Sequence, residues 1–387
     1  MHNDSLETEG SRDADTVMTP REENGTNSSP WASLTSKTQI ATVEHAIADL
    51  RNGFPVVVQG IERGATLVMA AETARLETLT SAVETPDAGL VIPAVILRHA
   101  GIKTEDAQRF DISGWTVEEL TQTVFSPVVN LANGGEDAPV EDVAAIHLLK
   151  LAQLLPTAVT VPVPSSIDVS HLVAVDVTTI LRHHDNIAYQ LSIVARTRTP
   201  LAECENTEFV LFHGSDGLKE QLAILIGAPS VGAPVPVRVH SACLSGDLFG
   251  SLKCDCGEQL RGAVDAIAKK GGGVLLYLDQ EGRSIGLRNK MRANRLQELD
   301  YDTFDADAAL GYGPDERRYG IAQRMLELLG YHRVLLLTNN PKKASALASD
   351  TICVVGTEPL HGSVNRHNAR YLATKAKRAG HLLPDLD

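Results

Sequence analysis

The chain has 387 residues, of which 43% are hydrophobic and 4% aromatic, and its formal net charge at pH 7 is −14. A chain of this length is long enough for two domains, each with its own core. The negative charge argues against a general attraction to nucleic acid or anionic membranes, so a polyanionic ligand would need a local cluster of cations. No apolar run reaches the ~18 residues of a membrane-spanning helix, and no secretory signal is visible at the N-terminus. We therefore expect a cytoplasmic protein.

The first part of the chain divides into a tail and a domain. Residues 1–38 are polar and lack hydrophobic periodicity, which predicts a disordered tail. Residues 39–193 are expected to form the first domain, beginning with a helix in TVEHAIADLRNG. Four apolar residues of this segment share one helical face, namely Val43, Ala46, Ile47 and Leu50. Strands are predicted in PVVVQG and ATLVMAAE, and further along a helix over 148–155 and a strand over 159–163.

Residues 194–387 are expected to form the second domain, in which strands and helices alternate. Strands are predicted in PVRVH, VLLYL, RVLLLTNN and ICVVG. Helices are predicted over 259–270, from the loop QEGRSIGL to Leu299, over 316–329, from Pro341 onward, and in the basic tail NRHNARYLATKAKRAGHLL. This alternation predicts an α/β fold.

Three of the five cysteines, Cys243, Cys254 and Cys256, lie within HSACLSGDLFGSLKCDCGEQL. An odd number of cysteines, three of them clustered, favours metal binding in a reducing compartment over a disulfide framework. Three thiolates around a zinc ion leave the fourth position open for water, and such zinc brings the pKa of that water from 15.7 to about 7. Because the spacing is not the paired C-x-x-C pattern, two alternatives stay open. These are buried free thiols and a structural zinc site completed by a histidine such as His240.

Three further polar segments of the second domain are suited to binding phosphates. Gln280-Glu281-Gly282-Arg283 follows a strand and ends in a guanidinium that fits a phosphate. Asp315-Glu316-Arg317-Arg318 is predicted at a helix start, where carboxylates are ordinary but arginines favour a bound anion. Thr338-Asn339-Asn340-Pro341-Lys342-Lys343 combines a hydroxyl, amides and lysines at a strand-to-helix turn. Together with the cysteines they indicate a hydrolase acting on a nucleotide, or else a zinc-stabilised nucleotide-binding domain without chemistry.

Four motifs of the second domain resemble those of GTP cyclohydrolase II, an enzyme of riboflavin synthesis. They are VRVHSACLSGDLFGSLKCDCGEQL, GVLLYLDQEGRSIGLRNKMRA, LGYGPDERRYGIA and LLTNNPKK. The resemblance implies a domain with a mixed sheet and flanking helices, an α/β (α+β) fold, and a homodimer. It also implies zinc and Mg²⁺ as cofactors and GTP as the substrate. The implied products are 2,5-diamino-6-ribosylamino-4(3H)-pyrimidinone 5′-phosphate, formate and pyrophosphate.

The resemblance also assigns roles to individual residues. It implies that Cys243, Cys254 and Cys256 bind the zinc, with the activated water attacking C8 of guanine. Asp315 matches the family's proton acceptor, and Arg317 matches a residue proposed as nucleophile on the α-phosphorus. Since an arginine has a pKa above ~12, we interpret Arg317 as an electrostatic clamp on the phosphates. Positions matching contacts to GTP are Arg238, Gln259, Glu281, Gly282, Arg283, Thr303, Thr338 and Lys343.

Two positions near the expected site depart from the family pattern. Ala242 replaces a glutamate, which removes one polar contact to the substrate. Asn294 replaces a tyrosine close to the zinc, and an amide cannot act as a phenolic acid with a pKa near 10. We therefore expect an activity that is slow or that stops at the formylated pyrimidine. A nucleotide-binding regulatory pseudoenzyme is the alternative from a different class.

The first domain resembles 3,4-dihydroxy-2-butanone 4-phosphate synthase in TVEHAIADLRNGFPVVV and LVMAAE. Between these segments that family carries an acidic metal-binding run of the form DDEDRENEGD. This chain has QGIERGAT there, where Glu62 and Arg63 are the remaining charges. The family's metal-binding histidine, in a GHTEA segment, falls near Glu141, where that motif is not kept. We interpret residues 39–193 as a degenerate, inactive domain whose remaining role is packing, dimerisation or regulation.

Overall fold

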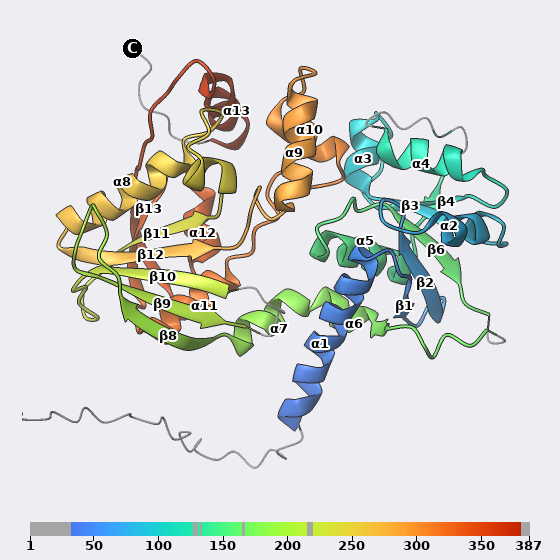
Figure 1. Cartoon of the computed structure of the whole chain (residues 1–387), viewed down its shortest axis with the longest axis horizontal. Helices are drawn as coiled ribbons and strands as arrows, with labels where there is room; N and C mark the ends of the chain where they lie inside the picture. The colour runs from blue at the N-terminus through green and yellow to red at the C-terminus, as the bar shows by residue number, and fades with distance from the viewer. Residues whose placement is uncertain (1–31, 127–130, 132–133, 165–166, 215–219, 381–387) are drawn as a thin grey trace, which may run out of the picture.

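The computed structural model describes residues 32–126, 131, 134–164, 167–214 and 220–380, which form two domains (Figure 1). The tail predicted over 1–38 lies outside the described residues as far as residue 31. Residues 32–38 belong instead to the first helix, α1 (Ala32–Arg51). Among the described residues, no helix combines the length and the apolar character needed to cross a bilayer.

The N-terminal domain is built on a seven-stranded sheet in the order β5-β4-β3-β6-β2-β1-β7. All its pairs are antiparallel except the parallel pair of β1 and β7. The strands are β1 (Val56–Gln59), β2 (Ala65–Ala70), β3 (Gly89–Ile92), β4 (Gln108–Asp111), β5 (Glu136–Asp137), β6 (Ala158–Pro162) and β7 (Ala174–Asp176). The helices that follow α1 are α2 (Leu76–Val83), α3 (Ala94–His99), α4 (Val117–Phe125), α5 (Val140–Leu151), α6 (Val177–Leu181) and α7 (His183–Gln190).

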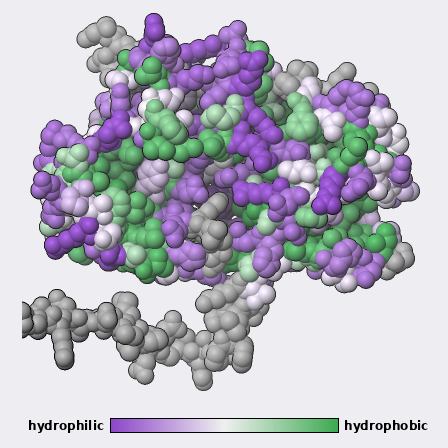
Figure 2. Space-filling model, viewed as in Figure 1, coloured by the Kyte–Doolittle hydropathy of each residue, from purple (hydrophilic) through white to green (hydrophobic). Residues whose placement is uncertain are grey.

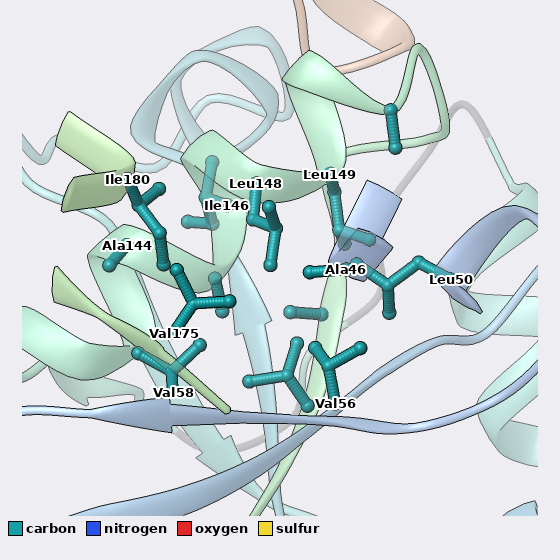
Figure 3. Packing of buried hydrophobic residues seen from close by; sticks show 14 of the residues in the cluster. Ala46, Leu50, Val56, Val58, Ala144, Ile146, Leu148, Leu149, Val175 and Ile180 are labelled. Atoms are coloured by element: carbon teal, nitrogen blue, oxygen red, sulfur yellow. The ribbon is translucent and has the colours of Figure 1, made fainter. Parts of the chain in front are cut away.

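Helices cover both faces of this sheet, because successive side chains of a strand point to opposite faces. Val68 of β2 packs into the core beneath α1, α5 and α6, whereas its neighbour Met69 packs into the core beneath α2, α3 and α4. Figure 3 shows the first core, where Leu50 of α1 and Leu148 of α5 lie above Val56 of β1. The apolar face predicted for the first helix is confirmed, since all four of its residues are buried there.

Helix α5 differs in its bounds from the helix predicted over 148–155. It begins earlier, at Val140, and ends at Leu151. Gln153, two residues after the helix, has a φ of 56°. A residue in this left-handed region commonly terminates a helix. The apolar pattern of the sequence continues past this point because the residues that follow are also buried.

The C-terminal domain contains a mixed sheet flanked by helices, as predicted. Its order is β14-β13-β11-β12-β10-β9-β8, with β12, β11, β13 and β14 mutually parallel and the remaining pairs antiparallel. The strands are β8 (Ser192–Arg198), β9 (Thr207–His213), β10 (Glu220–Gly227), β11 (Val235–Ser241), β12 (Gly272–Leu278), β13 (Arg333–Leu337) and β14 (Cys353–Glu358). The helices are α8 (Cys256–Lys269), α9 (Gly286–Gln297), α10 (Thr303–Ala309), α11 (Gly320–Leu329), α12 (Lys342–Leu347) and α13 (Ala369–Ala379). The boundary expected at 193/194 falls inside β8, two residues after that strand begins.

The order of the parallel strands brings three predicted segments together. Strand β11 lies between β12 and β13, and all three run in the same direction. Their carboxyl ends lead into the cysteine segment, the loop 279–285 and the turn that begins at Thr338. Ligands of open α/β sheets bind at this edge, outside the carboxyl ends of the strands. The topology therefore places one site at the ends of β11, β12 and β13.

One predicted helix start is wrong, and it concerns the candidate site. The helix expected from Glu316 begins only at Gly320, so Asp315 and Arg317 lie in an irregular loop. Within that loop, the Asp315 side chain accepts the Arg317 N–H, and the Glu316 side chain accepts the Gly313 N–H. Such local hydrogen bonds compete with helix formation.

A buried ion pair links β4 to α5 in the N-terminal domain. Arg109 Nε lies 3.2 Å from Asp142 Oδ2, and these side chains are 9% and 0% exposed. Burial raises the pKa of Asp142 and lowers the pKa of Arg109, although the opposite charge of each partner counteracts this. Burial thus disfavours both charges, and each depends on the other.

We expect Arg109→Met to lower the free energy of unfolding of the N-terminal domain by about 3–5 kcal/mol, because Asp142 would keep a buried charge without its partner. Urea denaturation followed by circular dichroism measures this loss. The double variant Arg109→Met/Asp142→Leu should regain most of the stability, since both charges are then gone. A single variant as stable as the parent chain would contradict the expectation.

Candidate functional site

The three predicted metal ligands come together in the structure. The sulfur atoms of Cys243, Cys254 and Cys256 all lie within 4.8 Å of one another. Cys243 Sγ is 3.8 Å from Cys254 Sγ, and Cys243 is buried. Hydrogen bonds from Cys254, Cys256 and Lys290 lower the pKa of Cys243. Three sulfur donors at this spacing, one of them ionised at neutral pH, could hold a soft divalent metal.

The backbone around the cysteines is held by one aspartate. After Cys243 the chain forms a π-helical turn, Leu244–Leu248. Asp247 in this turn accepts hydrogen bonds from the Cys243 N–H at 2.9 Å, from His240 Nε2 at 3.1 Å and from the Tyr277 hydroxyl at 3.0 Å. Thus His240 supports the turn through Asp247, and among the described residues its ring nitrogens do not join the three sulfur atoms in one cluster of potential ligands.

Gly246 in the same turn lies directly against the sulfur cluster. A Cβ at this position would be 2.8 Å from Cys254 Sγ and 3.0 Å from Cys243 Sγ. Contacts this short would displace the sulfur atoms. The turn can therefore pass over the cluster only with glycine at position 246.

Lys290 is a site residue that our sequence reasoning missed. Its ammonium group lies 3.1 Å from Cys243 Sγ, 3.0 Å from Ser245 Oγ and 2.7 Å from Glu281 Oε1. Burial alone would lower the pKa of Lys290, but Glu281 and Cys243 raise it above its ordinary value. The sequence did contain a signal for this placement. Lys290 is four residues before Asn294, a position expected close to the zinc, and side chains at this spacing share one helix face.

Glu281, predicted to contact GTP, connects three parts of the site. Its Oε1 binds Lys290, and its Oε2 accepts the Leu244 N–H at 2.6 Å. Gly282 and Arg283 follow with φ values of 63° and 62°. This left-handed backbone is unfavourable for arginine, so the loop is held in a strained conformation that directs its residues toward the site.

Asp315 and Arg317 form a two-pronged ion pair. Arg317 Nε is 2.7 Å from Asp315 Oδ1, and Arg317 Nη2 is 2.6 Å from Asp315 Oδ2. Burial alone would raise the pKa of Asp315, but Arg317 lowers it below its ordinary value. Burial likewise acts to lower the pKa of Arg317, and Asp315 raises it. The carboxylate is therefore ionised and the guanidinium charged at neutral pH.

Arg238, which is buried, and Gln259, which is half-buried, form a hydrogen-bonded network in the wall of the site. Arg238 is 5% exposed and donates to the Leu337 carbonyl at 2.9 Å and to Gln259 Oε1. Gln259 Nε2 in turn donates to Asp255. Burial lowers the pKa of Arg238 to about 10, so it remains charged. The amide of Gln259, a position predicted to contact GTP, is thus held in one orientation by protein groups.

The remaining predicted contacts also lie at this edge of the sheet. Thr338 accepts the Asn340 N–H at 3.1 Å, and Lys343 Nζ donates to the Val239 carbonyl at 3.1 Å. Thr303 is the first residue of α10. These three side chains are less than 9% exposed.

Arg283 pairs with a buried carboxylate, Asp307. Burial raises the pKa of Asp307 to about 6, and Arg283 opposes this rise. Within the described residues, the Nε atoms of Arg283 and Arg238 are buried without a hydrogen-bond partner. Since these Nε atoms are buried, an anionic ligand in the cavity would have to meet other N–H groups of the two guanidinium groups.

All the predicted site residues line one cavity of about 520 Å³. They are Arg238, Cys243, Cys254, Cys256, Gln259, Glu281, Gly282, Arg283, Thr303, Asp315, Arg317, Thr338 and Lys343. The two departures from the family pattern, Ala242 and Asn294, line it as well. A volume of this size lies within the range of small-molecule sites.

Glu62 and Glu141 of the N-terminal domain lie where the resemblance to a synthase would lead us to look for a metal site. Glu141 is fully buried, and its Oε1 accepts the backbone N–H groups of Glu62 at 2.9 Å and Arg63 at 3.0 Å. Glu62 Oε2 in return accepts the Val140 N–H at 3.1 Å. These two carboxylates hold the loop 60–64 against the start of α5.

Comparisons with known proteins agree with the geometry. The family model for GTP cyclohydrolase II matches residues 192–359. A GTP cyclohydrolase-2 of Xylella fastidiosa (strain Temecula1) is 39% identical over 352 residues, covering 89% of this chain and 87% of that protein. A GTP cyclohydrolase-2 of Azospirillum brasilense is 37% identical over 359 residues, covering 88% of this chain and 93% of that protein. Both alignments extend beyond the family region into the N-terminal domain.

Among solved structures, a two-domain 3,4-dihydroxy-2-butanone 4-phosphate synthase from A. baumannii has a TM-score of 0.31 and 14% identity, covering 83% of this chain and 99% of that one. A likeness this weak carries no argument about the fold. The sequence relatives are decisive, because identity of 39% extends over most of both chains. The chain belongs to the GTP cyclohydrolase II family.

Proposed function

We propose that the chain is a zinc-dependent GTP cyclohydrolase II in riboflavin biosynthesis. It would convert GTP to 2,5-diamino-6-ribosylamino-4(3H)-pyrimidinone 5′-phosphate, with release of formate and pyrophosphate and with Mg²⁺ on the phosphates. The observation that carries this proposal is that three clustered thiols, a carboxylate and several cations line one cavity. A metal-activated hydrolysis of a polyphosphate needs these three kinds of group together.

The cysteine cluster fits zinc by the chemistry of its donors. Thiolates select zinc among common divalent ions, and three protein ligands are typical of catalytic zinc sites. When bound, the zinc would supply a water with a pKa near 7. Cys243, Cys254 and Cys256 would hold it, and Lys290 would balance their negative charge.

Asp315 and Arg317 would act as proton acceptor and phosphate clamp. The lowered pKa of Asp315 keeps its carboxylate ionised at neutral pH, as a proton acceptor must be before it acts. The raised pKa of Arg317 speaks against its acting as a neutral nucleophile. A charged guanidinium with five donors can bind Asp315 and still offer N–H groups to a phosphate.

The other proposed GTP contacts divide into base and phosphate groups. Gln259, oriented by Arg238 and Asp255, would bind the guanine edge. Arg283, Thr338 and Lys343 would bind the phosphates, supported by Glu281, Gly282 and Thr303 around them. The homodimer, the cytoplasmic location and the lack of nucleic-acid binding that we expected from the sequence stay predictions.

We expect the purified chain to release pyrophosphate from GTP, with the pyrimidine product identified by mass spectrometry. We expect elemental analysis to detect stoichiometric zinc in the parent chain, and Cys254→Ser should lose both this zinc and the activity, because two thiols bind zinc too weakly. Cys353→Ser is the matched control, since Cys353 is exposed on β14 and outside the cavity. Tight GTP binding without any product would favour the regulatory pseudoenzyme instead.

Lys290→Met should weaken zinc affinity by about 10–100-fold, the usual effect of removing a group that supports metal ligands. The physical reason is that the cluster and Glu281 would lose the cation between them. Competition with a chromophoric chelator measures this change. Lys269→Met provides the control, because Lys269 is exposed on α8 and pairs with Asp265. Equal zinc affinity in the two variants would exclude a supporting role for Lys290.

Asn294 leads to a prediction about the product. With an amide in place of the family's phenol, the parent chain should release less formate than pyrophosphate during early turnover. Asn294→Tyr restores a proton donor, and such a group typically speeds a step that needs it by about 10²–10⁴-fold. The ratio of formate to pyrophosphate should therefore rise toward one. If the parent chain already releases the two in equal amounts, deformylation does not depend on position 294.

A further inference from the structure

The N-terminal domain contacts the C-terminal domain at the segments that carry the site. Figure 1 shows α9 and α10 between the two domains, with α3 beside α10. Hydrophilic side chains prevail along this junction in the view of Figure 2. The catalytic candidates Asp315 and Arg317 follow α10, and Lys290 and Asn294 lie on α9.

Glu72 of the N-terminal domain holds α9 by its charge. Its side chain is 1% exposed, and its Oε2 lies 2.5 Å from Arg292 Nη1. Its Oε1 lies 3.5 Å from Arg288 Nη1 and accepts the Leu155 N–H at 3.3 Å. One buried carboxylate thus binds two arginines one turn apart on α9. These arginines lie two residues before and two residues after Lys290 in the sequence, and they do not line the cavity.

A second contact between the domains fixes α9 through the amide side chain of Asn289. Asn289 is fully buried, and its Nδ2 donates to the Gln153 carbonyl at 2.9 Å and to the Tyr312 hydroxyl at 3.1 Å. The Tyr312 hydroxyl in turn donates to the Leu154 carbonyl. The strained Gln153, with its φ of 56°, points its carbonyl at α9. Residues 153 and 154 therefore tie α9 and the loop after α10 to one another.

The loop that carries Asp315 and Arg317 has its own contact with the N-terminal domain. Lys150 Nζ lies 2.6 Å from Glu316 Oε1, with the side chains 24% and 20% exposed. The same Oε1 accepts the Gly313 N–H at 2.7 Å. Lys150 thereby fixes the residue between the proposed proton acceptor and the proposed clamp.

The two domains also pack closely around the cavity. A Cβ on Gly311, which has a φ of 86°, would lie 2.6 Å from Pro156 Cγ. Val95 of α3 lines the cavity itself. Part of the cavity wall thus belongs to the N-terminal domain.

We propose that the N-terminal domain works as a positioning domain for the GTP site, an inference that rests on the proposed function. Glu72 and the segment 150–156 hold α9 and the loop 311–317 in register. Through these contacts they place Lys290, Asn294, Asp315 and Arg317 around one cavity. Glu72 is a positioning residue, because it acts through Arg288 and Arg292.

Glu72→Gln tests this assignment in the full-length chain. We expect kcat for pyrophosphate release to fall by about ten- to hundredfold, as slight misplacement of reacting groups does, with the KM for GTP and the zinc content unchanged within twofold. Hydrogen exchange of residues 286–297 should become faster, because α9 loses its anchor. Glu77→Gln is the matched control, since Glu77 is 79% exposed and 4.0 Å from Arg75 in the same domain.

Lys150→Met is the second variant, in case Glu72→Gln does not fold. It should lower kcat for pyrophosphate release by a similar factor. Hydrogen exchange of residues 311–319 should become faster, because Glu316 loses its contact with Lys150. Parent-like kcat and parent-like exchange in the folded variants would overturn the proposal. If the parent chain releases no pyrophosphate, the proposed function fails, yet the exchange of α9 still shows whether Glu72 holds it.

Discussion

The site depends on keeping three sulfur atoms together in a partly buried place while their negative charge is balanced. Lys290 supplies the balancing charge, and Glu281 keeps Lys290 in position. Glu281 also binds the backbone of the turn that follows Cys243. The cysteine segment, the loop after β12 and helix α9 are therefore joined by one set of charged hydrogen bonds. A shift of any of these segments would change the spacing of the sulfur atoms.

Three arginines of the cavity are each held by an acidic or polar partner of the same domain. Arg317 binds Asp315, Arg283 binds Asp307, and Arg238 binds Gln259. Arg317–Asp315 and Arg283–Asp307 are neutral as pairs, so they offer a polyphosphate N–H donors rather than a net positive charge. The partners also fix the guanidinium groups before a ligand arrives, which lowers the entropy lost on binding. Part of each arginine stays available, because a carboxylate occupies only some of its five donors.

Much of the fold could be predicted because its signals are local. The face of α1 and the strands that lead into the site follow from apolar periodicity. The cysteines and the segments predicted to bind phosphates were recognisable as motifs. The parallel order of β12, β11 and β13 brings together the cysteine segment, the loop after β12 and the turn at Thr338. The helix start at Glu316 could not be predicted, since the pairing of Asp315 with Arg317 and the contact of Glu316 with Lys150 depend on tertiary structure. The role of Glu72 could not be predicted for the same reason, because its arginine partners are more than 200 residues away in the sequence.

Glu141 has a structural role in the N-terminal domain. It lies near the position that the resemblance gives to a metal-binding histidine, and it fastens the loop 60–64 by two backbone hydrogen bonds. A neutral imidazole there could accept at most one N–H group, so Glu141→His would release part of the loop and lower the stability of the domain. The acidic run that the resemblance requires would still be missing, because the chain has QGIERGAT at that place. This one change would therefore weaken the domain without assembling a metal site in it.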